Sequence, residues 1–283
     1  MLSPRDLPDR LRCVRHLVLD LDGTVYLGRK VFPWTNPFLA LLRKLGLSFS
    51  FITNNNSLST EEYLARLAEM GIQVGRDSLY TSTLATIEYL RQEMPLARKL
   101  FILGTPSLRS ELSAAGFGEA GESPGDPPDA VIVGFDRTLT YERLCRAAYW
   151  IDRGKPFIAT HPDHVCPTDE ETVLVDCASI CACLARAAGR EPDVVLGKPG
   201  ERMILGLRRR LGLESGDLAV VGDRLYTDMK MARASGSLAV LVLSGETQEE
   251  EAERSREAVD LIVRDLGELG RLVEEAFGKP RAS

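Results

Sequence analysis

The sequence lacks any apolar stretch long enough to cross a membrane. Its longest apolar runs, such as AVIVGF and LAVLVL, fall far short of the roughly 20 residues that a transmembrane helix needs. The opening segment, MLSPRDLPDRLRCVR, also lacks the apolar centre of a signal peptide, because charged residues interrupt it throughout. We therefore expect a cytoplasmic protein that does not bind membranes.

An excess of positive charge and a secretory setting for disulfides are also lacking. The formal net charge of −6 provides no long-range attraction for nucleic acid or anionic lipid. Six cysteines are few for 283 residues and follow no secretory signal, so we expect reduced thiols. These absences favour small molecules or proteins as partners, and no nucleic acid.

A dinucleotide-binding fingerprint is missing as well. The turn after the first apolar strand reads DLDGTVYLG, without the GxGxxG pattern that lets a backbone approach a pyrophosphate. A nicotinamide- or flavin-dependent oxidoreductase is therefore disfavoured.

What the sequence does contain is a regular alternation of short apolar runs and helical patterns. This alternation is typical of βα units and predicts an α/β fold with a mostly parallel sheet. The predicted strands lie near 16–21, 48–53, 99–103, 130–134, 157–160, 193–196, 218–222, 238–243 and 260–263. The predicted helices lie near 36–45, 59–70, 82–92, 106–115, 140–152, 177–188, 200–211, 228–235, 248–256 and 266–277.

Four short polar motifs follow the predicted strands, where open α/β sheets form their binding crevice. They are DLDGT at 20–24, TNNN at 53–56, GKP at 197–199 and GDRLYTD at 222–228. Their position at the carboxyl ends of strands indicates that they contribute to one reaction.

The first and last motifs supply carboxylates. Asp20 and Asp22 leave the first strand in the same general direction, and their mutual repulsion favours a bound cation. Asp223 and Asp228 can complete a site made of oxygen ligands. Such a site suits Mg²⁺, which usually shares its coordination shell with a phosphate.

The middle motifs supply phosphate donors. Thr53 and the backbone amides around Asn54 and Asn55 can donate hydrogen bonds to a phosphate. Lys198 adds a positive charge from another part of the chain. Together the four motifs predict a magnesium-dependent site for a phosphorylated small molecule.

In this order the four motifs resemble the signatures of the haloacid dehalogenase (HAD) superfamily. Further segments are similar to its NagD-like and p-nitrophenyl phosphatase branch: TNNNSLS, FILGTPSLRSEL, VIVGFDRTLTYERL and IATHPD. The similar segments cover nearly the whole chain, and four ordered motifs are a specific signal.

The resemblance implies a role for each motif residue. Asp20 is the expected nucleophile that forms an aspartyl phosphate, and Asp22 the acid and base that serves both half-reactions. Mg²⁺ is expected on the Asp20 and Asp223 carboxylates and the Asp22 carbonyl, with Asp228 orienting its waters. The phosphoryl group is expected to bind Thr53, Asn54 and Lys198.

The resemblance also implies the fold. A Rossmann-like core with a parallel sheet is expected from residues 1–81 and 191–283, and an inserted, smaller α/β cap from residues 82–190. The segment between Asn54 and Lys198 is indeed too long for a simple βα connection. Self-association through the cap is common in this branch, so a homodimer is also an expectation.

The segment ATHPDHVCP departs from the branch, which usually has asparagine where His161 stands. His161 is thus a candidate substrate-binding residue, with a surface loop role as the alternative. A soft-metal site formed by His161, His164 and Cys166 fits no standard zinc spacing. On the predicted helix at 177–188, Cys177 and Cys181 share a face and Cys183 does not, so core thiols are expected rather than a metal site.

These features predict a magnesium-dependent phosphatase of small phosphomonoesters, with p-nitrophenyl phosphate as an artificial substrate. Sugar phosphates, phosphoglycolate, pyridoxal phosphate and nucleoside monophosphates are all candidate substrates. Two alternatives stay open: a phosphotransferase or mutase that uses the same aspartyl phosphate, and a catalytically silent protein that binds ligands with the same fold.

Overall fold

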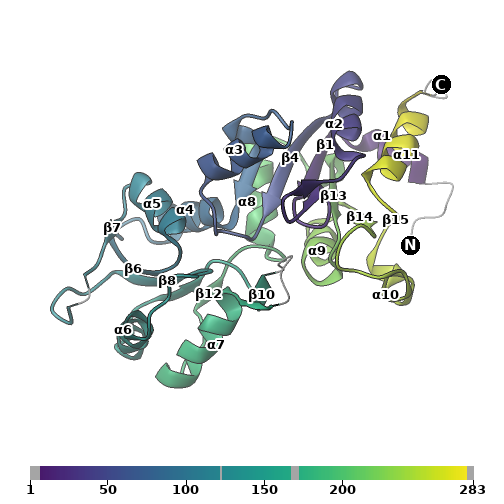
Figure 1. Cartoon of the computed structure of the whole chain (residues 1–283). Coiled ribbons are helices and arrows are strands. Elements are labelled where there is room, and N and C mark those ends of the chain that lie inside the picture. Colours follow the sequence, from purple (N-terminus) through teal and green to yellow (C-terminus); the bar gives the residue numbers. More distant parts are fainter. Residues whose placement is uncertain (1–6, 122, 167–171, 279–283) are drawn as a thin grey trace. The chain divides into compact units, whose positions relative to one another are not determined.

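The structure is a computed structural model that describes residues 7–121, 123–166 and 172–278. The chain divides into two compact units, which Figure 1 shows in sequence colours. Unit 1 comprises Met1–Ile52, Arg66–Tyr80 and Ile204–Ser283, and unit 2 comprises Thr53–Ala65 and Thr81–Met203. The predicted division into a catalytic core and a cap at 81/82 and 190/191 stays a prediction.

Unit 1 is built on a six-stranded sheet in the order β15-β14-β13-β1-β4-β5. Its pairings from β15 to β4 are parallel, and β1 lies between β13 and β4. The strands are β1 (His16–Asp20), β4 (Ser48–Thr53), β5 (Leu79–Thr81), β13 (Leu218–Gly222), β14 (Leu238–Val242) and β15 (Leu261–Val263). Every residue of β1, β13 and β14 is buried, as expected for parallel strands that are covered on both faces.

A short hairpin and several helices connect the strands of this sheet. A hairpin joins β2 (Tyr26–Leu27) to β3 (Lys30–Val31) directly after β1. The helices here are α1 (Leu7–Cys13), α2 (Thr35–Lys44), α3 (Thr60–Glu69), α8 (Glu201–Leu211), α9 (Lys230–Ser235), α10 (Glu249–Arg254) and α11 (Leu266–Gly278). Of these, α3 and α8 begin in the part of the chain assigned to unit 2.

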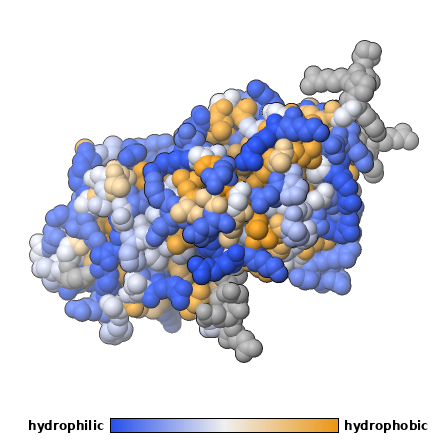
Figure 2. Space-filling view, turned by 45° about the horizontal axis from the view of Figure 1, so that its top comes forward, coloured by the Kyte–Doolittle hydropathy of each residue, from blue (hydrophilic) through white to orange (hydrophobic). Residues whose placement is uncertain are grey.

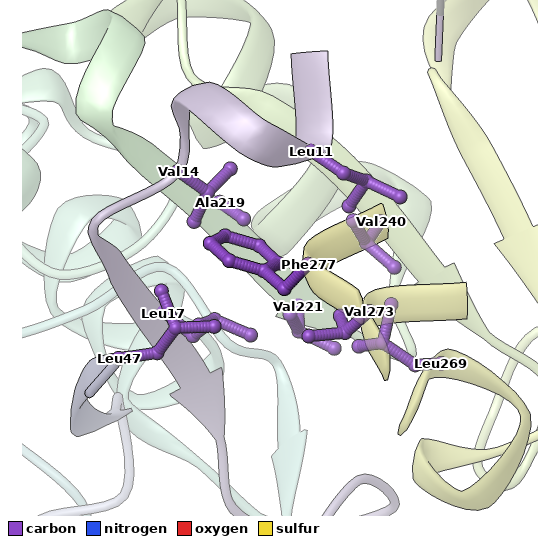
Figure 3. Close-up of a pocket in the computed structure, with 10 residues that line it drawn as sticks. All are labelled: Leu11, Val14, Leu17, Leu47, Ala219, Val221, Val240, Leu269, Val273 and Phe277. Carbon is purple, nitrogen blue, oxygen red and sulfur yellow. The ribbon is translucent and has the colours of Figure 1, made fainter. Parts of the chain in front are cut away.

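An apolar layer fixes α1 and α11 on the sheet of unit 1. A cavity of about 10 Å³ lies there, and Figure 3 shows the apolar side chains that line it. The lining residues are Leu11, Val14, Leu17, Leu47, Ala219, Val221, Val240, Leu269, Val273 and Phe277. A space of this size holds about one water molecule, so it is a packing gap of the core and not a ligand site.

Unit 2 contains a five-stranded parallel sheet in the order β12-β9-β8-β6-β7. Its strands are β6 (Lys99–Leu103), β7 (Gly118–Glu119), β8 (Ala130–Val133), β9 (Phe157–Ala159) and β12 (Val194–Val195). A separate hairpin pairs β10 (Val165–Cys166) with β11 (Leu174–Val175). The helices are α4 (Ser82–Glu93), α5 (Pro106–Ala114), α6 (Tyr141–Asp152) and α7 (Cys177–Ala188).

The two faces of this sheet form two apolar cores, because successive strand residues point to opposite sides. Phe101 and Val131 pack with the α6 and α7 side chains, whereas Leu100 and Ile132 pack with α4 and α5. Figure 1 shows the corresponding arrangement, with α6 and α7 on one face and α4 and α5 on the other.

The predicted α/β architecture with parallel sheets is confirmed, and every predicted strand and helix is present with small shifts of its ends. The sequence patterns missed α1, β5 and the short hairpin strands, which are too short to show a period. The face shown in Figure 2 mixes polar residues with scattered apolar ones. No helix within the described ranges is long and apolar enough to cross a membrane.

Candidate active site

Three carboxylates of unit 1 meet at the carboxyl ends of its central strands. Asp20 is the last residue of β1, and Asp223 follows β13, which is its parallel neighbour. Asp228 lies in the wide helical turn Leu225–Met229 that leads into α9. One oxygen atom from each carboxylate lies within 4.8 Å of the others, and all three side chains are buried. We call these three residues the acid cluster.

Glycines make room for the acid cluster. A Cβ atom on Gly23 or Gly245 would clash with the carboxylate of Asp223, and one on Gly222 would clash with Asp228. Gly23 also has φ of +84°, which a side chain would strain. The turn after β1 therefore needs glycine both for its backbone conformation and for the close approach of an acid from β13.

Backbone amides hold two of the three acids in place. The Glu246 N–H donates to Asp223 Oδ2 at 2.7 Å, and the Arg224 N–H donates to Asp228 Oδ2 at 3.3 Å. The acids are thus oriented by the chain itself, independently of any ligand.

Arg224 brings a buried cation to the cluster. Burial would lower the pKa of its guanidinium, but the charges of Asp20, Tyr226, Asp223 and Glu246 outweigh burial and raise it. Its Nε lies 2.9 Å from Glu246 Oε2, so part of its charge is used outside the cluster. Sequence reasoning did not assign a role to Arg224, although it lies inside the GDRLYTD motif.

The acid cluster fits a divalent cation. Three ionised carboxylates this close repel one another, and one arginine offsets only part of their charge. Hard oxygen ligands of this kind suit Mg²⁺ or Ca²⁺. Asp22 is half-buried, and its carboxylate is not among the three that gather; the role of its backbone carbonyl as a metal ligand stays a prediction.

The predicted phosphate-binding residues belong to unit 2 and form a network of their own. Asn54 Oδ1 accepts the backbone N–H of Lys198 at 2.6 Å, and Asn54 Nδ2 donates to the Lys198 carbonyl at 2.9 Å. Thr53 Oγ1 accepts the N–H of Asn55 at 3.1 Å. The Asn54 side chain therefore makes hydrogen bonds with both the N–H and the carbonyl of Lys198.

The Asn54 amide group is fully engaged. Asn54 Nδ2 also donates to Asp163 Oδ1 at 3.1 Å, so both hydrogens of the side-chain amide have protein acceptors. This arrangement leaves the side chain of Asn54 to hold the GKP segment, and the backbone amide is the part of Asn54 that can serve a phosphate. The roles of Thr53, Asn54, Asn55 and Lys198 in phosphate binding stay predictions.

His161 lies in a second group of three buried side chains, also within unit 2. Its Nδ1 is 3.6 Å from Asp163 Oδ2, and its Nε2 is 3.5 Å from Asp176 Oδ1. We call His161, Asp163 and Asp176 the histidine cluster. The His161 side chain has no exposed surface, which excludes the surface-loop alternative; the substrate contact that the sequence suggested stays a prediction.

The carboxylates change the charge of His161. Burial alone would lower the pKa of the ring, but the Cys177 sulfur and the Asp163 and Asp176 carboxylates outweigh burial and raise the pKa to about 9. Sequence reasoning missed both acids. The available signal for Asp176 was its place directly before the helix at 177–188, where its carboxylate accepts the Cys177 N–H as the N-cap of α7.

The remaining candidate metal ligands do not assemble. Among the described residues, His161 gathers with Asp163 and Asp176 and not with His164 and Cys166. The expected pattern of the helical thiols is confirmed, since Cys177 and Cys181 are buried and Cys183 is exposed.

Residues 17–118 match the haloacid dehalogenase-like hydrolase family, and residues 195–269 match the HAD-hydrolase-like family. The chain belongs to the HAD family. It is 31% identical to the ribonucleotide monophosphatase NagD of Escherichia coli over 232 residues, which cover 82% of this chain and 88% of that protein. The predicted family and NagD-like branch are thereby confirmed.

Solved structures agree with this membership. The 4-nitrophenylphosphatase of Thermotoga maritima is similar with a TM-score of 0.88 and 39% identity, covering 93% of this chain and 99% of that one. The glycerol phosphate phosphatase of Mycobacterium tuberculosis in complex with magnesium has a TM-score of 0.83 and 30% identity, covering 92% and 78%. The same enzyme was also solved with calcium, so these relatives support a divalent metal site in the family.

Proposed function

We propose that this protein is a magnesium-dependent phosphatase of small phosphomonoesters, with Asp20 as the nucleophile. The observation that carries the proposal is the acid cluster, in which three buried carboxylates from adjacent strand ends and the following turn lie within 4.8 Å of one another. No apolar ligand or simple structural role calls for such a concentration of buried negative charge, whereas a divalent metal that also binds a phosphoryl group does.

The residues divide the reaction between them. Asp20 attacks phosphorus in line with the leaving alcohol and forms an aspartyl phosphate, while Asp22 gives its proton to the departing oxygen. Asp22 then takes a proton from the water that attacks the phosphorus and releases inorganic phosphate from Asp20. The half-burial of Asp22 suits a group that exchanges protons with both substrate and water.

Asp20, Asp223 and the Asp22 carbonyl would hold the Mg²⁺, and Asp228 would orient its water ligands. When bound, the ion offsets the charge of the carboxylates and of the phosphoryl oxygens. Lys198 and the amides near Asn54 are the proposed donors to the phosphoryl group. Arg224 keeps a permanent positive charge beside Asp20, which favours the ionised, nucleophilic form of that carboxylate.

The substrate is a small alcohol phosphate. The relatives are named for a ribonucleotide, for 4-nitrophenyl phosphate and for glycerol phosphate, so they support the phosphomonoester class without selecting one member. Sugar phosphates, nucleoside monophosphates, phosphoglycolate and pyridoxal phosphate are the compounds to test first.

A phosphate-release assay on this panel tests the proposal. We expect turnover of p-nitrophenyl phosphate and at least one physiological ester with Mg²⁺, and none with excess chelator. Addition of an alcohol acceptor separates hydrolysis from transfer, because a phosphotransferase would then form a new ester at the expense of free phosphate. Absence of turnover on the whole panel, with Mg²⁺ present, would overturn the proposal.

A further inference from the structure

The histidine cluster of unit 2 is enclosed and already contains its own cation. The His161 ring has no exposed surface, and each of its nitrogens lies within 3.6 Å of a carboxylate oxygen. Neither nitrogen makes a hydrogen bond with the described part of the chain, so its contacts with the two carboxylates are ion pairs. The ring is therefore clamped between Asp163, in its own loop, and Asp176, at the start of α7.

This geometry requires a charged ring. A neutral imidazole carries one N–H and one lone pair, so one of the two carboxylates would face a lone pair across 3.5 or 3.6 Å. A doubly protonated ring attracts both carboxylates and pairs electrostatically with each. The nearest thiol is linked to the same charge: burial would raise the pKa of Cys177, but the Cys181 thiol and the charge of His161 outweigh burial and lower it to about 6. Cys177 Sγ also lies 3.1 Å from the Val133 carbonyl, to which its protonated form donates.

The contacts of the histidine cluster extend to the predicted phosphate-binding residues. Asp163 turns Oδ2 toward His161 and accepts the Asn54 amide with Oδ1 at 3.1 Å. Asn54 in turn makes two hydrogen bonds with the backbone of Lys198. The packing is equally close, since a Cβ atom on Gly197 would lie 2.6 Å from Asn54 Oδ1 and 2.7 Å from His161 Cβ.

We propose that His161 is a positioning residue, whose charged ring fixes Asp163, and through Asp163 and Asn54 fixes the backbone that carries Lys198. The proposal rests on the proposed function, in which Lys198 binds the phosphoryl group. His161 acts without touching the substrate. Its effect on the reaction is then an effect on the placement of a phosphate ligand, where a displacement of about 1 Å can cost up to roughly 100-fold in rate.

Three substitutions separate positioning from simple loss of packing. His161→Leu removes both donors at similar volume, His161→Asn keeps one donor for Asp163, and Asp176→Asn removes one anion while leaving the pair of His161 and Asp163. We expect His161→Leu to lower kcat/KM for p-nitrophenyl phosphate by about 10- to 100-fold and to weaken inhibition by inorganic phosphate. We expect His161→Asn to restore most of this loss and Asp176→Asn to remain close to wild type.

A double variant controls for the charge that His161→Leu leaves unpaired. Combining His161→Leu with Asp176→Asn should recover much of the lost thermal stability, because one buried carboxylate is neutralised. It should not recover the KM for the phosphoester or the inhibition by phosphate, because Asp163 still lacks the charged ring of His161. Equal recovery of stability and of KM would reduce His161 to a structural role and overturn the proposal.

A nitrogen NMR experiment gives a readout that does not depend on activity. The chain has three histidines, and His16 is an internal control because burial lowers its pKa to about 4. In protein with ¹⁵N-labelled histidine at pH 7.5, we expect the ring nitrogens of His161 to have the chemical shifts of an imidazolium. Those of His16 should have the chemical shifts of a neutral imidazole. A neutral His161 overturns the proposal. So does a stoichiometric metal ion in the purified wild type that His161→Leu lacks, since the ring would then be a ligand.

These measurements distinguish failure of the inference from failure of the proposed function. An active wild type whose KM, kcat and phosphate inhibition are unchanged in His161→Leu would overturn the positioning role alone. An inactive wild type overturns the proposed function, and with it the catalytic part of this inference, whatever the charge of His161.

Discussion

The acid cluster and the histidine cluster each gather three buried ionisable side chains within 4.8 Å, and they solve the problem of buried charge differently. Asp20, Asp223 and Asp228 are all acids, and Arg224 beside them also pairs with Glu246. The histidine cluster instead places a basic ring between its two acids. An incompletely compensated cluster attracts a metal, whereas an internally compensated one holds parts of the chain together.

Substitution of Asp20, the proposed nucleophile in the acid cluster, should have the largest effect on activity. Asp20→Asn keeps the shape of the side chain but cannot form the aspartyl phosphate, so we expect kcat for p-nitrophenyl phosphate to fall by at least about 1000-fold. Because one repelling charge is removed, thermal unfolding in chelator should not occur at a lower temperature than in wild type. Steady-state kinetics and calorimetry measure the two effects.

A matched control for Asp20→Asn is Asp152→Asn, which removes an exposed carboxylate from the end of α6. This variant should retain wild-type turnover. Residual activity of Asp20→Asn above a few per cent would show that another group attacks phosphorus.

Metal binding should stabilise the protein through the acid cluster and not through the histidine cluster. Excess Mg²⁺ at about 100 times its Kd adds about 2.7 kcal/mol to the free energy of unfolding, because it binds the folded state. We expect this rise in Tm to disappear in Asp223→Asn and to persist in Asp176→Asn. If the rise in Tm were lost in Asp176→Asn and kept in Asp223→Asn, the metal would bind the histidine cluster and not the acid cluster.

The acid cluster could be predicted from the sequence because its members obey a simple rule. Asp20 and Asp223 each follow a run of apolar residues that forms a buried parallel strand, and parallel neighbours bring their carboxyl ends to one edge. Asp228 follows within the same motif, on the turn that begins the next helix. The position of these motifs after predicted strands was sufficient for this prediction.

The histidine cluster could not be predicted in the same way. Asp163 follows β9 and Asp176 precedes α7, and neither segment has a period or spacing that identifies its partner. The hydrogen bond from Asn54 to Asp163 joins residues 109 positions apart, through tertiary packing alone. The ring of His161 is fully buried, which its place in a polar loop segment did not indicate.

The charge of His161 should appear as a pH dependence of stability. Because the folded state raises the pKa of His161 from its ordinary 6.5 to about 9, folding favours the protonated ring. The resulting stabilisation is complete below pH 6.5 and is lost as pH rises through 9, by an amount on the order of 3 kcal/mol. Urea unfolding at several pH values checks this, with His161→Asn as the variant that should lose the dependence.

His16 provides a contrast within the same experiment. Burial lowers its pKa to about 4, so the folded state disfavours its protonated form, and the corresponding loss of stability occurs as pH falls from 6.5 toward 4. The two buried histidines thus affect opposite sides of neutral pH. A wild-type stability that stays level between pH 6.5 and 9, after correction with His161→Asn, would contradict a charged His161.

The smallest expected effect concerns the thiol beside the histidine cluster. Cys177 lies close enough to His161 to act as its counterion, and the contact of its Sγ with the Val133 carbonyl suits the protonated thiol. Cys177→Ser keeps a donor of similar shape and removes any group that ionises near neutral pH, so we expect a change in unfolding free energy of about 1 kcal/mol or less. The pH dependence due to His161 should remain, because the Asp163 and Asp176 carboxylates hold the ring. If Cys177→Ser instead abolished that dependence, the partner of the cation would be the thiolate, and the histidine cluster would be a redox-sensitive ion pair with no need for its two acids.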